Sequence, residues 1–160
     1  MLYFLIISKK ENQVVRNLNK ENLSQYIPNG VNLIYNKWES VDGGLEIYYW
    51  IPESSYFVQS SSSRIRQFNG WVNDGNPLES KVSQRNLKTL DNFGGEYLCL
   101  EVDENGMGFI KRNLTSSVQI YFSKNDIVTI ISNRVSLINY VLRPNESVKN
   151  CLDSNFLAWT

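Results

Sequence analysis

The chain contains few residues that could carry out nucleophilic or metal-dependent chemistry. Among its 160 residues there is no histidine, and the two cysteines are Cys99 and Cys151. The lack of histidine excludes Ser-His-Asp and Cys-His triads and every histidine-based metal site. Cys99 lies in an apolar run, where a free cysteine usually behaves as a small buried hydrophobe. Two cysteines do not make a disulfide framework, so we expect a reducing, cytoplasmic setting.

Two short polar segments could bind ligands, and each also has a simpler interpretation. The acidic residues Glu101, Asp103 and Glu104 could bind a hard cation, but they fall at an expected hairpin tip, which favours a solvated turn. The glycine-rich segment 42–46 (DGGLE) could cradle a phosphate if a helix followed it. A β-rich segment, Leu45–Ile51, follows instead, which predicts a tight turn. We therefore expect no metal or cofactor site in these residues.

Charge and hydropathy argue against nucleic acid and membrane partners. Lysine and arginine total 16, and aspartate and glutamate also total 16, so the net charge is zero. No apolar stretch approaches the roughly 18 residues that a membrane-spanning helix needs. The opening segment, MLYFLII, has no basic residue before it and is followed by Lys9 and Lys10, which is wrong for a signal peptide. We predict that it is a buried strand.

Most of the remaining patterns predict strands. Leu45–Ile51 and Ile65–Val72 are rich in aromatic and β-branched residues. Two further pairs of apolar runs flank polar turns at 103–106 (DENG) and 123–126 (SKND), which is typical of hairpins. We predict that these pairs form one antiparallel meander from the strands Glu96–Val102, Met107–Arg112, Val118–Phe122 and Ile127–Ile131.

The end of the sequence predicts helices. Apolar residues at helical spacing in Arg134–Leu142, with Ser132 or Asn133 as N-cap and Pro144 beyond, indicate one helix. A second helix is predicted from Asp153. Its large apolar side chains have little to pack on, which indicates a piece of a longer polypeptide; alternatively they dock back on the domain. These side chains are Phe156, Leu157 and Trp159.

Five short motifs follow one another along most of the chain. They are 68–74 (FNGWVND), 94–97 (GGEY), 111–113 (KRN), 118–122 (VQIYF) and 131–134 (ISNR). Their order resembles that of the class II glutamine amidotransferase domain of asparagine synthetase-like proteins. That domain carries Asn-Gly-x-x-x-Asn, then Gly-x-Phe-Ala, Arg-Asp, Gly-x-x-Pro-Leu-Tyr-Tyr and a Ser-Glu or Ser-Asn step. The resemblance implies an α+β, four-layer αββα sandwich of the N-terminal-nucleophile (Ntn) hydrolases, with mostly antiparallel sheets and few helices.

The resemblance also implies a division of the chain and a set of site residues. Residues 1–143 would be the glutaminase-like domain, and 144–160 a linker and the start of a helix leading to a missing C-terminal synthetase domain. ATP and magnesium would bind only in that missing domain. Asn69 and Gly70 match the pair that forms the oxyanion hole of the glutaminase. The family's nucleophile is a cysteine that becomes the first residue when the initiator Met is removed.

The chain departs from the family at the residues that perform the chemistry. Leu2 occupies the position of the nucleophilic cysteine, and no Ser, Thr or Cys precedes Ser8. The arginine that binds the glutamine carboxylate has no match within 45–57, and Arg64 or Arg66 would be arbitrary assignments. The acidic residue for the glutamine amine would have to be Glu79 or Asp91, in a short connection. Asn69-Gly70 alone is a vestigial oxyanion hole, or equally an Asn-Gly at the end of a strand.

We therefore expect a degenerate, non-catalytic domain of a bacterial, ATP-dependent amide-forming enzyme. Relatives without the cysteine include β-lactam synthetases and macrolactam-forming enzymes of natural product biosynthesis. The expected partner is the synthetase domain of the same polypeptide or a partner enzyme, and a homodimer is left open. Two alternatives remain: a free-standing accessory protein that binds a peptide or partner enzyme through its aromatic first half, and an amidohydrolase with an unrecognised nucleophile. The aromatic residues could equally be core.

Overall fold

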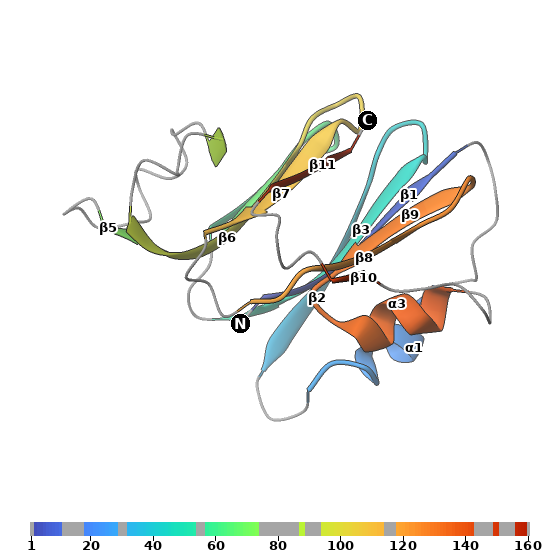
Figure 1. Cartoon of the computed structure of the whole chain (residues 1–160), viewed down its shortest axis with the longest axis horizontal. Helices are drawn as coiled ribbons and strands as arrows, with labels where there is room; N and C mark the ends of the chain where they lie inside the picture. The colour runs from blue at the N-terminus through green and yellow to red at the C-terminus, as the bar shows by residue number, and fades with distance from the viewer. Residues whose placement is uncertain are drawn as a thin grey trace.

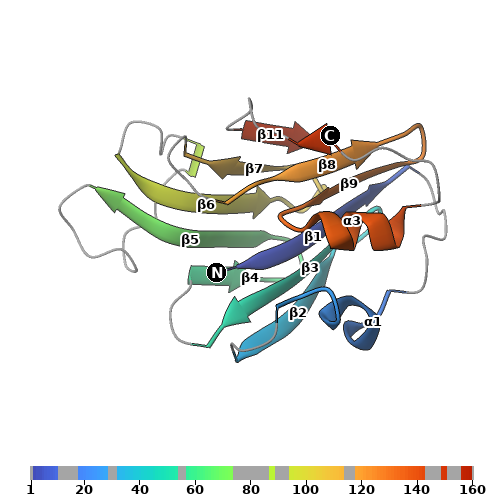
Figure 2. The same ribbon diagram turned by 60° about the horizontal axis from the view of Figure 1, so that its bottom comes forward.

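In the part of the chain that the structure describes, two antiparallel β-sheets lie face to face, and two helices cover the outer face of one of them (Figures 1 and 2). This computed structural model describes residues 2–10, 18–28, 32–53, 57–73, 87–88, 94–113, 118–142, 149–150 and 156–159. Among the described residues, no helix is both long and apolar enough to cross a membrane.

The first sheet is built around the N-terminal strand. β1 (Tyr3–Lys9) lies between β3 (Leu45–Pro52) and β9 (Val128–Ser132), antiparallel to both. The order across the sheet is β10-β8-β9-β1-β3-β2. The outer strands are β2 (Leu33–Glu39), β8 (Tyr121–Lys124) and β10 (Lys149–Asn150). The sequence predicted a buried strand at MLYFLII, and β1 confirms it: Phe4 to Ile7 are each at most 1% exposed.

The second sheet has the order β11-β7-β6-β5-β4. Its strands are β4 (Phe57–Ser60), β5 (Ile65–Asn73), β6 (Gly94–Val102), β7 (Gly108–Arg112) and β11 (Phe156–Trp159). Side chains alternate between the two faces of a strand. Leu98 and Leu100 of β6 therefore point towards the first sheet, into a core that they share with Phe4 and Ile47.

A second core lies on the other face of the first sheet, under the helices α1 (Lys20–Ser24) and α3 (Val135–Val141). Leu5 and Ile7 of β1 belong to this core, whereas Phe4 and Ile6 belong to the core between the sheets. β1 is thus apolar on both faces because each face is covered. The helix predicted at Arg134–Leu142 is confirmed as α3. Asn19 caps α1 by accepting a hydrogen bond from the Asn22 amide at 2.8 Å.

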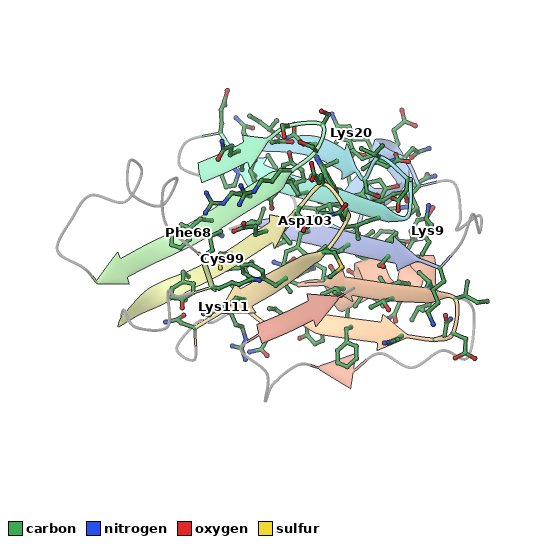
Figure 3. The ribbon with its side chains drawn as sticks, turned by 90° about the horizontal axis from the view of Figure 1, so that it is seen from above. Lys9, Lys20, Phe68, Cys99, Asp103 and Lys111 are labelled. Atoms are coloured by element: carbon green, nitrogen blue, oxygen red, sulfur yellow. The ribbon has the colours of Figure 1, made fainter. Side chains whose placement is uncertain are left out.

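The predicted four-layer αββα sandwich is wrong. The described residues form mostly antiparallel sheet, with helices on one side only. On the outer face of the second sheet, the described Leu87–Lys88 form a short 3₁₀ turn rather than a layer of α-helix. The Lys111 ammonium donates a 2.7 Å hydrogen bond to the Lys88 carbonyl, which fixes this turn against the sheet. Phe68, Cys99 and Lys111 lie side by side on that face (Figure 3), and each is at most 4% exposed.

The predicted single meander is also wrong. Both predicted turns are present: Gly106 adopts a φ of +74° between β6 and β7, and Asn125 links β8 and β9. However, β6 and β7 pair within the second sheet, while β8 and β9 pair within the first. Each hairpin is specified by its own turn, whereas the choice of sheet depends on distant strands that local patterns do not reveal.

The helix predicted from Asp153 is replaced by a strand where the structure describes the chain. Residues Phe156–Trp159 form β11, which pairs antiparallel with β7, with Leu157 opposite Ile110. Just before it, β10 pairs with β8 at the edge of the first sheet. The segment 144–160, predicted as a linker and the start of a helix, thus contributes one strand to each sheet (Figure 1). Asp153 and Pro144 lie outside the described residues.

Candidate functional site

Leu2, which stands where the resemblance places a nucleophile, is a core residue. Its side chain is 3% exposed and packs between the two sheets. Its backbone carbonyl accepts a 2.7 Å hydrogen bond from Nδ2 of Asn133. Asn133 Oδ1 in turn accepts a 3.1 Å hydrogen bond from the backbone N–H of Phe4. The side chain at position 2 is therefore held in a fixed place, but a leucine there has no atom that can attack a substrate.

Asn133 and its neighbours act as a clamp on the start of β1. Ser132 Oγ donates a 2.5 Å hydrogen bond to the Phe4 carbonyl, and the Arg134 guanidinium lies 5.9 Å from the centre of the Tyr3 ring. The sequence predicted Ser132 or Asn133 as the N-cap of the helix. The N-cap residue is Arg134, which makes no side-chain capping hydrogen bond. Asn133 instead holds residues more than 120 positions away in the sequence, a contact that no local pattern indicates.

Asn69 and Gly70 lie inside β5 rather than at its end. Asn69 is opposite Leu98, and Gly70 is opposite Tyr97. Gly70 has a φ of +120°, and a Cβ added there would lie 2.0 Å from the Glu96 carbonyl oxygen. Only glycine allows the two strands to approach this closely. The close approach of β5 and β6 is enough to explain why position 70 is a glycine, and a role in an oxyanion hole is not needed for this explanation.

Leu2 and Asn69 lie on facing sheets, both away from the β2–β3 turn. The β2–β3 turn of the first sheet lies beside two turns of the second sheet. A Cβ on Gly106, in the β6–β7 turn, would lie 3.6 Å from Ser40. Trp38 Nε1 donates a 2.8 Å hydrogen bond to the carbonyl of Ser61, between β4 and β5. β1 runs towards these turns and β5 runs away from them, because each strand is antiparallel to its neighbours. The structure thus places the two predicted site residues on different sheets, with no hydrogen bond between them among the described residues.

The inner face of the second sheet carries an unexpected buried amide. Gln67 is 1% exposed and lies opposite Leu100, which belongs to the core between the sheets. Among the described residues, neither Oε1 nor Nε2 of Gln67 has a hydrogen-bond partner. A buried polar group without a partner costs about 1–3 kcal/mol. An isolated glutamine in an otherwise β-type run gives no sequence signal that it is buried in this way.

The acidic residues near the β6–β7 turn bind cationic and backbone groups of the chain itself. Glu101 forms ion pairs with Arg64 and with Arg66, the latter at 3.3 Å from Nε. Asp103 Oδ1 accepts hydrogen bonds from the backbone N–H groups of Asn105 (2.9 Å) and Met107 (3.0 Å). The predicted polar turn is therefore confirmed. Across the described residues, no three His, Cys, Asp or Glu side chains come together in a metal-binding group.

The candidate residues for binding glutamine are not brought together as a site. Arg64 and Arg66 both form ion pairs with Glu101. Glu79 and Asp91 lie outside the described residues.

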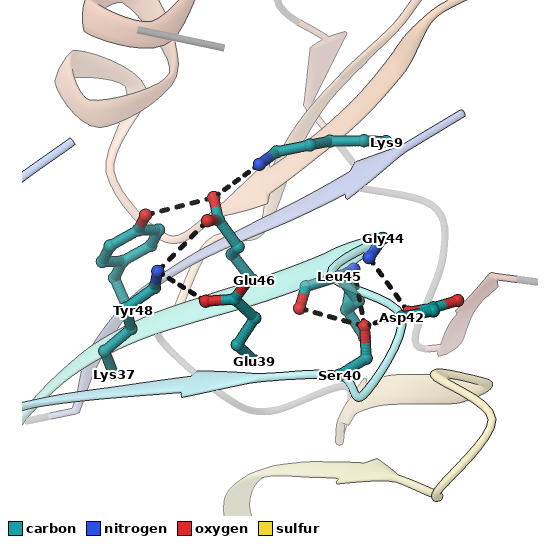
Figure 4. A network of polar contacts seen from close by, with 9 residues as sticks. All are labelled: Lys9, Lys37, Glu39, Ser40, Asp42, Gly44, Leu45, Glu46 and Tyr48. Atoms are coloured by element: carbon teal, nitrogen blue, oxygen red, sulfur yellow. Dashed lines mark hydrogen bonds and ion pairs between the residues drawn. The ribbon is translucent and has the colours of Figure 1, made fainter. Parts of the chain in front are cut away.

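The glycine-rich segment at 42–46 forms the predicted tight turn between β2 and β3 (Figure 4). Ser40 Oγ donates a 2.6 Å hydrogen bond to Asp42 Oδ1 and accepts one from the Leu45 N–H at 2.9 Å. Asp42 Oδ1 also accepts a 3.0 Å hydrogen bond from the Gly44 N–H. The hydrogen bonds from Ser40 and Gly44 lower the pKa of the Asp42 carboxyl. Because these donors lock the turn, they do not form a phosphate cradle.

A network of charged side chains crosses the first sheet next to this turn (Figure 4). Glu46 on β3 binds Lys9 and Lys37, each at 3.1 Å, and accepts a hydrogen bond from the Tyr48 hydroxyl, also at 3.1 Å. Lys37 Nζ also lies 2.8 Å from Glu39 Oε2. Burial opposes ionisation of Glu46, but the two lysines outweigh it and lower the pKa of this carboxyl. Burial and the nearby charge of Glu46 raise the pKa of Tyr48.

This network is well satisfied, which is typical of a structural role. Burial disfavours the charge on Lys37, but its hydrogen bonds to Glu39 and Glu46 raise the pKa of the ammonium overall. Because these carboxylates keep the Lys37 amine protonated, it is not available as a nucleophile. No sequence pattern predicted this cluster. Its only signal was the alternation of Lys37 and Glu39 in a segment that was not predicted to be a strand.

Comparison with profiles of known protein families and with curated protein sequences finds no match for this chain. The link to asparagine synthetase-like proteins therefore rests on the order of the sequence motifs alone.

Proposed function

We propose that the chain is a non-catalytic, glutaminase-like domain that scaffolds an ATP-dependent amide-forming synthetase domain. The observation that carries the proposal is the buried, clamped Leu2, which lies where catalysis by this family requires a cysteine. The order of the motifs supports the choice of partner, either a synthetase domain of the same polypeptide or a separate enzyme. ATP and magnesium would bind that partner, in the cytoplasm of a bacterium.

The start of β1 supports a scaffold role because hydrogen bonds hold its backbone in place and it carries no reactive side chain at position 2. Asn133 holds both Leu2 and Phe4, and Gly70 serves strand packing. A catalytic strand and an oxyanion-type segment would then have been retained as structure. The four-layer fold of active relatives is not part of this proposal.

The two alternatives have less support from the described residues. An amidohydrolase needs an activated nucleophile, but Cys99 is fully buried and Ser40 is locked in a turn. An accessory protein that binds through its aromatic first half needs exposed rings. Trp38, Tyr48, Tyr49 and Trp50 are each at most 5% exposed, so these four are core residues. Tyr56 and Trp71 fall outside the residues whose side chains are described.

The test joins an activity assay to a binding assay. We expect the purified chain, with Met1 or Leu2 shown to be its first residue by mass spectrometry, to release no glutamate from L-glutamine. We also expect a synthetase domain with a Ser-Gly-Gly-x-Asp-Ser loop, encoded in the same reading frame or beside it, to co-purify with the chain. Glutamine hydrolysis above a no-protein control would overturn the non-catalytic role. A synthetase domain that keeps full ATP–pyrophosphate exchange without the chain would overturn the scaffold role.

A further inference from the structure

β2 is an edge of the first sheet. It pairs with β3 over its whole length, from Leu33 opposite Pro52 to Glu39 opposite Glu46. In the order of the strands it stands last, and no described strand pairs with its other side (Figures 1 and 2). An edge of seven residues presents a row of backbone donors and acceptors on which a further strand can form.

The hydrogen bonds beside the turn show which residues of β2 face this open edge. The Ser40 N–H donates to the Leu45 carbonyl at 2.9 Å. In an antiparallel pair, successive residues alternate between bonding to the neighbour and facing away from it. Trp38 and Asn36 therefore bond to β3, whereas Lys37 and Glu39 direct their N–H and C=O groups outwards.

The same two residues carry complementary charges on one face of the strand. The side chains of Lys37 and Glu39 are 37% and 46% exposed. Glu39 lies directly opposite Glu46, and Lys37 is the cation that contacts both carboxylates, at 2.8 and 3.1 Å. A second cation on the open side of Glu39 would therefore offset the repulsion between two neighbouring carboxylates.

We propose that the β2 edge binds a second copy of this chain, antiparallel, around a two-fold axis at Trp38. In that register Lys37 stands opposite Glu39 of the second copy, and Glu39 stands opposite its Lys37. Both ion pairs form at once because the axis makes the interface self-complementary. About four backbone hydrogen bonds join the outward groups of the two strands. The network of Figure 4 then extends from Lys9 of one copy into the first sheet of the second copy.

The placement of apolar groups and of α1 agrees with this register. Ile34 and Val41, on or next to β2, are 45% and 81% exposed and gain cover from the neighbouring strand. The helix α1 lies near the N-terminal half of β2. Trp50, which is opposite Tyr35, donates a hydrogen bond from Nε1 to Ser24 Oγ of α1 at 3.2 Å. An axis at Trp38 keeps the two copies of α1 apart. An unrelated peptide would have to supply both charges at this spacing, whereas a second copy always does.

Charge exchange gives a direct test by analytical ultracentrifugation. We expect the wild-type chain to form dimers over about 10–500 μM, as a small interface predicts. Lys37→Glu and Glu39→Lys should each weaken dimerisation by about tenfold or more, because like charges then face each other twice. Mixing the two variants should restore the dimer, since every facing pair is again opposite in charge. The double variant K37E/E39K should form dimers by itself.

Glu39→Lys is the variant on which the test rests. It places a lysine opposite Glu46, so the folded chain should keep or gain thermal stability while the dimer is lost. Circular dichroism confirms that each variant is folded, and salt at about 0.5 M should weaken the wild-type dimer. The proposal is overturned if the wild-type chain stays monomeric, if E39K remains a dimer, or if two folded single variants fail to associate on mixing.

Discussion

The side-chain amide of Asn133 donates a 2.7 Å hydrogen bond to the carbonyl of Leu2, which lies 131 positions earlier in the chain. The same side chain accepts a hydrogen bond from Phe4. One residue thus satisfies two buried backbone groups at the start of the central strand, and it joins the first strand to the last helix of the described chain.

Replacing Asn133 should therefore destabilise the fold. Asn133→Ala leaves the Leu2 carbonyl and the Phe4 N–H without partners, which predicts a loss of about 2–4 kcal/mol in the free energy of unfolding. Asn133→Asp keeps the acceptor for Phe4 and should lose less. Urea unfolding measures both variants. Asn32→Ala, at an exposed position, should change stability by less than about 0.5 kcal/mol. Equal effects at positions 32 and 133 would contradict the clamp.

Gly70 should tolerate no side chain, for reasons of packing alone. In Gly70→Ala the new Cβ would lie 2.0 Å from the Glu96 carbonyl oxygen, so β5 and β6 must separate. We expect a loss of about 3 kcal/mol or more. Gly106→Ala is the matched control, because its φ is also positive but its new Cβ meets nothing closer than 3.6 Å. It should cost about 1 kcal/mol. Chemical denaturation compares the two, and a smaller loss at Gly70 would refute the close approach.

Gln67→Leu should stabilise the protein. The substitution removes two buried polar atoms that have no hydrogen-bond partner among the described residues, and it keeps a side chain of similar size between the sheets. The expected gain is about 1–2 kcal/mol in the free energy of unfolding. Gln59→Leu, at an exposed position on β4, should have little effect. The melting temperatures of the two variants test this, and a lower value for Gln67→Leu would show that the amide is satisfied in the folded protein.

Stability should fall with acid through Glu46. The pKa of this carboxyl is lower in the folded chain than its ordinary value of about 4.3. Between those two pKa values the unfolded chain binds more protons than the folded chain. The contribution of Glu46 to stability is therefore present above about pH 5 and is lost as the pH falls through the folded pKa. Denaturation between about pH 3 and pH 7 should show a shallower acid decline for Glu46→Gln than for the wild type. An unchanged decline would assign the effect to other groups.

The sequence specified much of the local structure. MLYFLII and Leu45–Ile51 are predicted as strands by their apolar, aromatic and β-branched residues, and β1 and β3 confirm them. Asn105-Gly106 and Asn125 predicted the two later hairpins through turn chemistry. β2 was missed because an edge strand with Asn36, Lys37 and Glu39 lacks a continuous apolar face.

The long-range arrangement was not predictable in the same way. The separation of the two hairpins into different sheets depends on pairing with β1 and β5, far away in the sequence. The strand β11 depends on an edge offered by β7, whereas local spacing favoured a helix. Of the candidate site, Leu2 and Asn69-Gly70 were located by motif, but the clamp by Asn133 and the charged network around Glu46 arise from tertiary contacts.

The central position of β1 has a consequence for how the chain is made. β3 can pair with β1 early during synthesis, but β9 and Asn133 emerge from the ribosome much later. The interval from the end of β3 to the start of β9 is about 76 residues, which at about 5–20 residues per second amounts to roughly 4–15 s. For that time this largely apolar strand has one open edge. A nascent chain of this kind is a natural client for chaperones that bind exposed strands.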